Sequence, residues 1–141
     1  MFVLDTNVVS ELRKVAAGKA DPEVAAWAAS TPSGSMFISA ITVLELELGV
    51  LAIEHRDAPS GEVLRAWLHT RVLSTFAKRT LPVDAAVALR CAALHVPDPR
   101  AERDALIAAT ALVHGMAVVT RNVRDFEPMG VDVVNPWEAA G

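Results

Sequence analysis

The sequence is poor in cysteine and has no surplus of positive charge. Cys91 is the only cysteine among 141 residues, so the chain can form neither an internal disulfide nor a thiolate zinc site. Because Cys91 lies in the helical run from Ala85 to Leu94, we expect it in the core. The 13 lysines and arginines are outnumbered by 17 aspartates and glutamates. This balance argues against a protein whose main role is non-specific adhesion to nucleic acid through a broad basic face.

No run of apolar residues approaches the roughly 20 that a membrane-spanning helix needs. The uncharged stretch 24–44 is broken by the polar segment 30–35, and the uncharged stretch 105–120 contains His114-Gly115. The N-terminus reaches Asp5 without a preceding basic region, unlike a secretory signal. We therefore expect no membrane association and a cytoplasmic location.

The glycines, histidines and serines lack the spacings of several common catalytic sites. None of the seven glycines falls in a G-x-G-x-x-G or G-x-x-x-x-G-K motif, so no nucleotide cofactor is expected. The four histidines show no metal-ligand spacing, and no serine lies in a nucleophile elbow. These patterns argue against a histidine-rich zinc site and against Ser/His/Asp hydrolysis.

The chain is rich in hydrophobic residues, which make up 52% of it, whereas 21% are charged. That composition can offset the entropy of chain ordering, which excludes a disordered protein. The length suits one domain with a single core, and we expect that domain to span residues 1–141.

Short apolar runs alternate with helical patterns along the chain. Strands are predicted at Phe2–Leu4, Met36–Ile38, Leu81–Val83, Met116–Val119 and Val131–Val134. Helices are predicted from Val8, after Asp21-Pro22, from Ser39 to about His55, over 63–72, over 85–95 and over 105–114. This alternation predicts an α/β domain with a mainly parallel sheet, and the turn residues 57–61 predict an antiparallel helical pair.

The helix after Ser39 carries an apolar face and an acidic residue that we expect to point inward. Helical spacing predicts a buried face made of Ile41, Leu44, Leu48 and Leu51. Glu45 lies near this face, with Gly49 and Ala52, whereas Glu47 is about 200 degrees round the helix. Of these two acids, Glu45 is therefore the candidate for a functional site.

Two further acids follow predicted strands, and one more lies on a helix. Asp5 directly follows the first strand, and Asp125 lies in the loop after the strand 116–119. Ligands of open parallel sheets bind outside the carboxyl ends of the strands, which makes both acids candidates. Asp104 precedes a very apolar helical run, where a carboxylate without a partner is costly. The alternative for Asp104 is a purely structural role as the helix cap.

Four carboxylates at one edge of a sheet would raise one another's pKa values unless divalent cations neutralise them. Hard oxygen ligands of this kind suit Mg²⁺ or Mn²⁺. Such ions polarise a phosphoryl oxygen and lower the pKa of a bound water, which is most of what phosphodiester hydrolysis needs. Setting these four aside from the 17 acidic residues leaves 13, equal to the 13 basic residues. The sequence thus suggests a metal site for phosphate chemistry.

Four segments, in this order, resemble the motifs of PIN-domain ribonucleases. They are 3–8 (VLDTNV), 38–46 (ISAITVLEL) with Gly49, 104–111 (DALIAATA), and 120–122 (TRN) with Asp125-Phe126. Together they span nearly the whole chain. Within that family the sequence is most similar to the VapC toxins of type II toxin–antitoxin systems, particularly the FitB-like branch. The closing Asn135-Pro136-Trp137 is also typical of that branch.

The resemblance implies a three-layer α/β/α PIN-like fold with a protruding helical pair. It also implies a Mg²⁺-dependent endoribonuclease, with Mn²⁺ as a substitute, that is inhibited by a small antitoxin protein docking beside the acidic site. By position, the metal-binding and catalytic residues would be Asp5, Glu45, Asp104 and Asp125. Supporting positions would be Thr6 and Asn7 after the first strand, and Thr120 and Asn122 after the later one.

The resemblance further implies a homodimer, which suits a chain with three tryptophans and abundant Leu, Val and Ala. Arg121 and Arg124 flank the fourth acid and could hold RNA phosphates, although solvated loop charge is an equal alternative. Glu47 and Glu102 are the acids that would most readily replace members of the set.

Two rival functions stay open. A PIN-like module could bind RNA or a protein partner without cutting. An aspartyl-phosphate phosphotransferase would also begin with a strand and an aspartate, but some such enzymes need a second acid two residues on, where this chain has Asn7.

Overall fold

A computed structural model describes residues 1–138, and residues 139–141 of the domain expected over 1–141 lie outside the described part. Five strands form one sheet in the order β3-β2-β1-β4-β5, and every neighbouring pair is parallel. The strands are β1 (Phe2–Leu4), β2 (Met36–Ser39), β3 (Thr80–Leu81), β4 (Ala117–Val119) and β5 (Val133–Val134). The predicted parallel sheet is confirmed.

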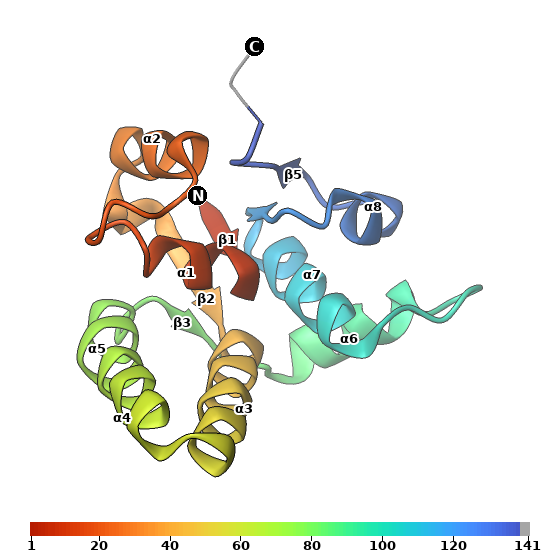
Figure 1. Ribbon diagram of the computed structural model, residues 1–141. Coiled ribbons are helices and arrows are strands. Elements are labelled where there is room, and N and C mark those ends of the chain that lie inside the picture. Colours follow the sequence, from red (N-terminus) through yellow and green to blue (C-terminus); the bar gives the residue numbers. More distant parts are fainter. Residues whose placement is uncertain (139–141) are drawn as a thin grey trace.

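Helices connect the strands in chain order (Figure 1). They are α1 (Thr6–Leu12), α2 (Pro22–Ser30), α3 (Ala40–Arg56), α4 (Ala58–Trp67), α5 (Leu73–Thr75), α6 (Ala85–Leu94), α7 (Glu102–His114) and α8 (Val123–Phe126). Shorter turns are the 3-10 helices η1 (Ser33–Ser35) and η3 (Glu127–Met129) and the π-helical turn η2 (Leu68–Val72). Within residues 1–138, no helix has both the length and the apolar character needed to cross a membrane.

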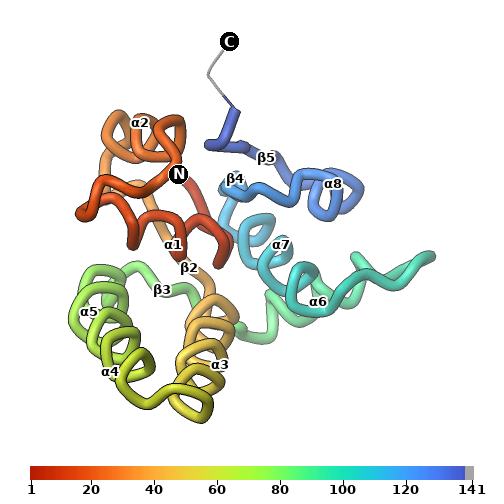
Figure 2. The backbone as a smooth tube through the Cα atoms, in the orientation of Figure 1, coloured from red at the N-terminus to blue at the C-terminus, as the bar shows by residue number. Residues whose placement is uncertain are grey.

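The sheet separates two hydrophobic clusters, so the domain has three layers. In β1, Val3 packs into a cluster with residues of α6 and α7, and Leu4 packs into a second cluster with residues of α1 and α3. This alternation is the two-residue period of a strand buried on both faces. Figure 2 shows the chain returning from β3 through α6 and α7 to β4, on the other side of β1. The predicted α/β/α architecture is confirmed.

Local sequence signals position several helix ends as predicted. The Asp21 carboxylate accepts hydrogen bonds from the backbone N–H groups of Glu23 and Val24 at the start of α2. Gly115 ends α7 with a φ of 66°, a left-handed conformation that glycine adopts without strain. Cys91 is 6% exposed in the core, and burial raises the pKa of its thiol, so it is an inert core residue.

The predicted turn over 57–61 is wrong, since only Asp57 lies outside a helix. The Asp57 carboxylate accepts a hydrogen bond from the Ser60 N–H, and Pro59 falls in the first turn of α4, where its missing N–H costs nothing. The predicted antiparallel pair therefore forms from α3 and α4 with a tighter connection, and Figure 1 shows it extending beyond the sheet. Arg65 of α4 holds the pair together by hydrogen bonds to Glu47 and Glu54 of α3.

The buried face of α3 differs from the predicted one. Its buried residues are Thr42, Leu46 and Val50. The predicted core residues Leu44, Leu48 and Leu51 are exposed to 45%, 46% and 49%, and we call them the α3 leucine stripe. Because the α3–α4 pair protrudes, only one side of α3 meets the core, and spacing alone does not tell which apolar side that is.

Candidate active site

Asp5 stands where β1 ends and α1 begins, at the carboxyl edge of the sheet. It is the N-cap of α1, and its carboxylate is 4% exposed. It accepts hydrogen bonds from the Thr6 backbone N–H at 2.8 Å, the Thr120 hydroxyl at 2.7 Å and the Asn7 amide at 3.3 Å. Burial raises the pKa of Asp5, and the carboxylates of Glu45 and Asp125 raise it further.

Thr120 ties the end of β4 to the end of β1. Its hydroxyl donates to Asp5 and accepts from the Asn122 backbone N–H at 3.0 Å and the Asn7 side chain at 3.4 Å. The Arg121 backbone N–H donates to the Asn7 side-chain oxygen at 3.4 Å. Asn7 and Thr120 thus fix the geometry around Asp5, whereas Asn122 contributes its backbone to this network.

Glu45 is brought to the same edge by the first half of α3. Its carboxylate accepts a 2.7 Å hydrogen bond from the Thr6 hydroxyl, which also lies 3.3 Å from the Thr42 hydroxyl. The Glu45 side chain is 24% exposed and forms a 3.7 Å ion pair with Arg103. The inward direction predicted for Glu45 is confirmed, although its expected neighbours Gly49 and Ala52 are exposed.

Asp104 lies in the first turn of α7 and is not its cap. The helix begins at Glu102 after its N-cap Ala101, three residues earlier than a capping role for Asp104 requires. The alternative prediction, that Asp104 caps this helix, is therefore wrong. Burial raises the pKa of Asp104 to about 6, and the carboxylates of Asp5, Asp125 and Glu45 contribute to that rise.

Asp125 comes from the short helix α8, which the buried ring of Phe126 anchors to the core. The Asp125 carboxylate is exposed, and it raises the pKa values of Asp5 and Asp104. Its neighbours Arg121 and Arg124 are both exposed, and the Arg121 guanidinium lies 5.2 Å from the centre of the Trp137 ring. Both arginines line one polar cavity together with Asp125, and their predicted contact with RNA phosphates stays a prediction.

The alternative acids Glu47 and Glu102 take no part in this cluster. Glu47 binds Arg65 on the other side of α3, with N–O distances of 2.8 and 2.6 Å. Glu102 raises the pKa of Cys91 and of neither Asp5 nor Asp104. Sequence reasoning missed Thr42 and Arg103, which have no motif of their own; the one available signal was that Arg103 directly precedes Asp104.

The four acids suit a hard divalent cation. They offer only oxygen ligands. Burial is the main cause of the raised pKa values of Asp5 and Asp104, and repulsion among the carboxylates, which such an ion would relieve, adds to it. Within residues 1–138 no three acidic, histidine or cysteine side chains are already placed to hold an ion together. Mg²⁺ keeps several of its waters and needs only one or two carboxylates, so the donor set fits it.

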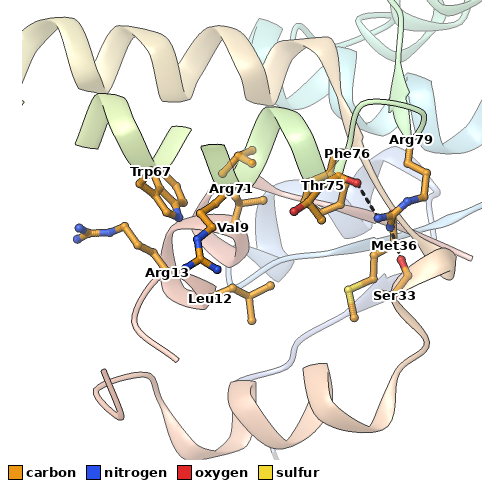
Figure 3. A pocket seen from close by; sticks show the side chains of 11 residues that line it. Val9, Leu12, Arg13, Ser33, Met36, Trp67, Arg71, Thr75, Phe76 and Arg79 are labelled. Carbon is orange, nitrogen blue, oxygen red and sulfur yellow. Dashed lines mark hydrogen bonds between the residues drawn. The ribbon is translucent and has the colours of Figure 1, made fainter. Parts of the chain in front are cut away.

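A separate apolar groove of about 220 Å³ lies between α1 and the α4–α5 segment (Figure 3). Val9, Leu12, Arg13 and Trp67 are among the residues that line it, and in Figure 3 the Arg13 side chain extends away from the others. The Arg13 guanidinium lies 5.8 Å from the centre of the Trp67 ring. A second cavity of about 390 Å³ shares this pair of side chains and reaches Thr6 and Glu45. Glu45 and two residues of the groove thus line one cavity, and no sequence motif predicted either cavity because distant segments form them.

Comparison with known proteins places this architecture among nucleases. The family model described as PIN domain matches residues 2–130. The chain is 38% identical to the VapC ribonuclease Y4jK of Sinorhizobium fredii over 99% of this chain and 100% of that protein. It is 37% identical to the toxin FitB of Neisseria gonorrhoeae over 97% of this chain and 99% of FitB. A solved structure of FitAB bound to an IR36 DNA fragment superposes with a TM-score of 0.89 at 35% identity, covering 100% of this chain and 99% of the other.

The chain therefore belongs to the PIN-domain family. Its similarity within that family is to proteins named VapC ribonuclease and FitB toxin, which confirms the resemblance that the four motifs indicated.

Proposed function

We propose that this chain is a divalent-metal-dependent endoribonuclease and the toxin component of a type II toxin–antitoxin module. The observation that supports the proposal is that Asp5, Glu45, Asp104 and Asp125, from four separate segments, lie near enough for their charges to help raise the pKa values of Asp5 and Asp104. Relatives of similar length that are named as ribonuclease and toxin support it.

Mg²⁺ or Mn²⁺ bound by these acids would polarise a phosphoryl oxygen of RNA and lower the pKa of an attacking water. The other residues position the acids. Thr120 and Asn7 hold the Asp5 carboxylate, and Thr6 holds Glu45. We assign Asn122 and the exposed arginines Arg121 and Arg124 to contacts with the RNA strand, because guanidinium groups bind phosphate through paired hydrogen bonds.

Cleavage of total RNA by the purified protein tests the proposal, with Mg²⁺, with Mn²⁺ and with EDTA. We expect discrete fragments with either metal and none with EDTA. An Asp5→Asn variant prepared identically controls for a contaminating nuclease. Intact RNA under every condition, together with RNA binding in a gel-shift assay, would instead favour the non-cutting PIN-like module.

We infer that the inhibitory partner is an antitoxin protein that docks in the apolar groove of Figure 3. The solved relatives include a FitAB complex and other toxin–antitoxin complexes. The groove is apolar, and Arg13, Arg71 and Arg79 line it, which suits an amphipathic segment with acidic residues. The second cavity shares Arg13 and Trp67 with the groove and is also lined by Glu45, so a segment that occupies both would contact this acid.

We propose that the protein is a homodimer, and that the α3 leucine stripe is part of the contact. Three leucines exposed to 45–49% on one protruding helix form the kind of apolar surface that association buries. Light scattering at micromolar protein and moderate salt should give the mass of a dimer. A Leu48→Glu variant should shift that mass to the monomer, while a monomer mass for the unmodified protein would refute the proposal.

We further propose that residues 1–141 act as one domain in the cytoplasm, where RNA substrates are found. The family model covers nearly all of the chain, and β1 and β5 belong to the same sheet.

A further inference from the structure

A polar cavity of about 220 Å³ lies between the start of α7 and α8, directly beside the acidic site. Asp104 and Asp125 form part of its wall, so the cavity and the site share two carboxylates. Arg100 and Arg124 line the same cavity. A volume several times that of one water molecule, about 30 Å³, is enough for a phosphate group with some of its hydration.

Arg100 is held in the loop before α7, and one of its side-chain donors has no partner among the described residues. Its backbone N–H donates to His95 Nδ1 at 3.1 Å, which fixes the loop. Its side-chain Nε is buried and, among the residues that the structure describes, has no hydrogen-bond partner. Buried polar groups are nearly always paired, so an unpaired guanidinium nitrogen beside a cavity points to a ligand that supplies the acceptor.

The residues of α8 that line this cavity are exposed, and they also line a second polar cavity. Arg124 lines both, and the second cavity, of about 630 Å³, is also lined by Arg121 and Asn122. The start of α7 adds backbone N–H groups, since Ala101 has no side chain that could cap them. Donors thus follow one another along a path that runs past Asp104 and Asp125.

We propose that Arg100 and Arg124 form a clamp for an RNA phosphate next to the one that is cut. The clamp rests on the proposed ribonuclease function and adds Arg100 to its substrate-binding residues. Planar guanidinium groups match the geometry of phosphate oxygens, and two of them on opposite sides of a cavity fix one phosphate in register with the acids. Asp104 and Asp125 repel a phosphate, and a divalent cation held by these acids would offset that repulsion.

Fluorescence anisotropy with a labelled pool of random-sequence single-stranded RNA tests the clamp. Binding is measured in Ca²⁺ over a range of salt concentrations, and a gel confirms that the probe stays intact. Loss of one phosphate contact should reduce the steepness of the plot of log K against log salt concentration by about 0.7. Near 0.1 M salt this corresponds to about a 5-fold weaker affinity. We expect this change for Arg100→Gln and again for Arg124→Gln.

The matched control is Arg56→Gln, which removes an exposed arginine from the last turn of α3. It should bind RNA as the unmodified protein does. Should Arg100→Gln prove unfolded by its melting curve, Arg100→Lys carries the test: it keeps the charge but lacks the paired donors of the guanidinium, and it should still weaken binding. Unchanged affinity and salt dependence in a folded Arg100 variant would overturn the clamp, because Arg124 is already assigned to RNA contacts.

The clamp and the nuclease can fail separately. Unmodified protein that cuts RNA while both clamp variants bind it normally would overturn the clamp alone. Protein that binds the probe through Arg100 and Arg124 but never cuts RNA would overturn the nuclease, and the two arginines would then be an RNA-phosphate site without a cutting role.

Discussion

Replacing Asp104 with Asn should abolish most RNA cleavage and, at the same time, raise the melting temperature of the metal-free protein. The cleavage rate should fall by about 10²–10³-fold, the loss typical of removing one group that stabilises developing charge. Stability should rise because Asp104 is partly desolvated and is repelled by Asp5, Asp125 and Glu45. Asn keeps the shape of the side chain and removes its charge. Rates on total RNA and a thermal melt in EDTA measure the two effects.

The control for this prediction is Asp132→Asn, the same chemical change at an exposed position between Val131 and β5. It should leave both the rate and the melting temperature unchanged. A drop in stability for Asp104→Asn, together with an unchanged cleavage rate, would show that Asp104 is a structural residue.

The metal-free protein should become more stable as the pH falls from about 7.5 to about 5. In the folded protein the pKa of Asp104 is about 6, above its ordinary value of 3.8, and the pKa of Asp5 is also raised. At pH values between the ordinary pKa of Asp104 and its raised pKa, the folded state binds more protons than the unfolded state. Protonation therefore stabilises the fold. For Asp104, this stabilisation is fully present below about pH 4 and is lost as the pH rises through about 6.

Protonation of carboxyl groups with lowered pKa values destabilises the fold, but this happens at a lower pH than the protonation of Asp104. The pKa values of Glu11 and Glu54 lie below their ordinary value of 4.5, so the stability they contribute is lost only as the pH falls below that value. The melting temperature in EDTA should therefore rise by about 2–4 °C when the pH is lowered from 7.5 to 5, after allowance for solvent screening. A melting temperature that falls over this interval would contradict the account.

Added Mg²⁺ should reverse this trend, because cation and protons compete for the same carboxylates. An ion at about 100 times its Kd stabilises the fold by about 2.7 kcal/mol, and the effect should be larger at pH 7.5 than at pH 5. An increase that is equal at both pH values would place the ion away from Asp5 and Asp104.

The sequence predicted the architecture well because its strongest signals are local. Val3 and Leu4 form an uncharged run that ends at a carboxylate, and this pattern alone places Asp5 at the edge of a buried parallel strand. Capping by Asp21 and the glycine at position 115 are likewise short-range effects. The resemblance to PIN domains then supplied the expected role of the four acids as metal ligands.

Features that depend on long-range packing could not be predicted from the sequence. The spacing of Leu44, Leu48 and Leu51 matches a buried face, yet tertiary contacts select Thr42, Leu46 and Val50 for the core. The ion pair of Arg103 with Glu45 and the cavity beside Arg100 join residues from separate segments. No local pattern encodes such pairings.

The central claim is that the four acids together bind the cation that cuts RNA. Its most direct test is Mn²⁺ titration by calorimetry, with RNA cleavage measured on the same samples of unmodified protein, Asp5→Asn and Glu47→Gln. Glu47 lies two residues from Glu45 but binds Arg65, away from the site. We expect Asp5→Asn to lose Mn²⁺ binding and cleavage together, and Glu47→Gln to keep both. Normal Mn²⁺ binding and normal cleavage in Asp5→Asn would contradict the claim.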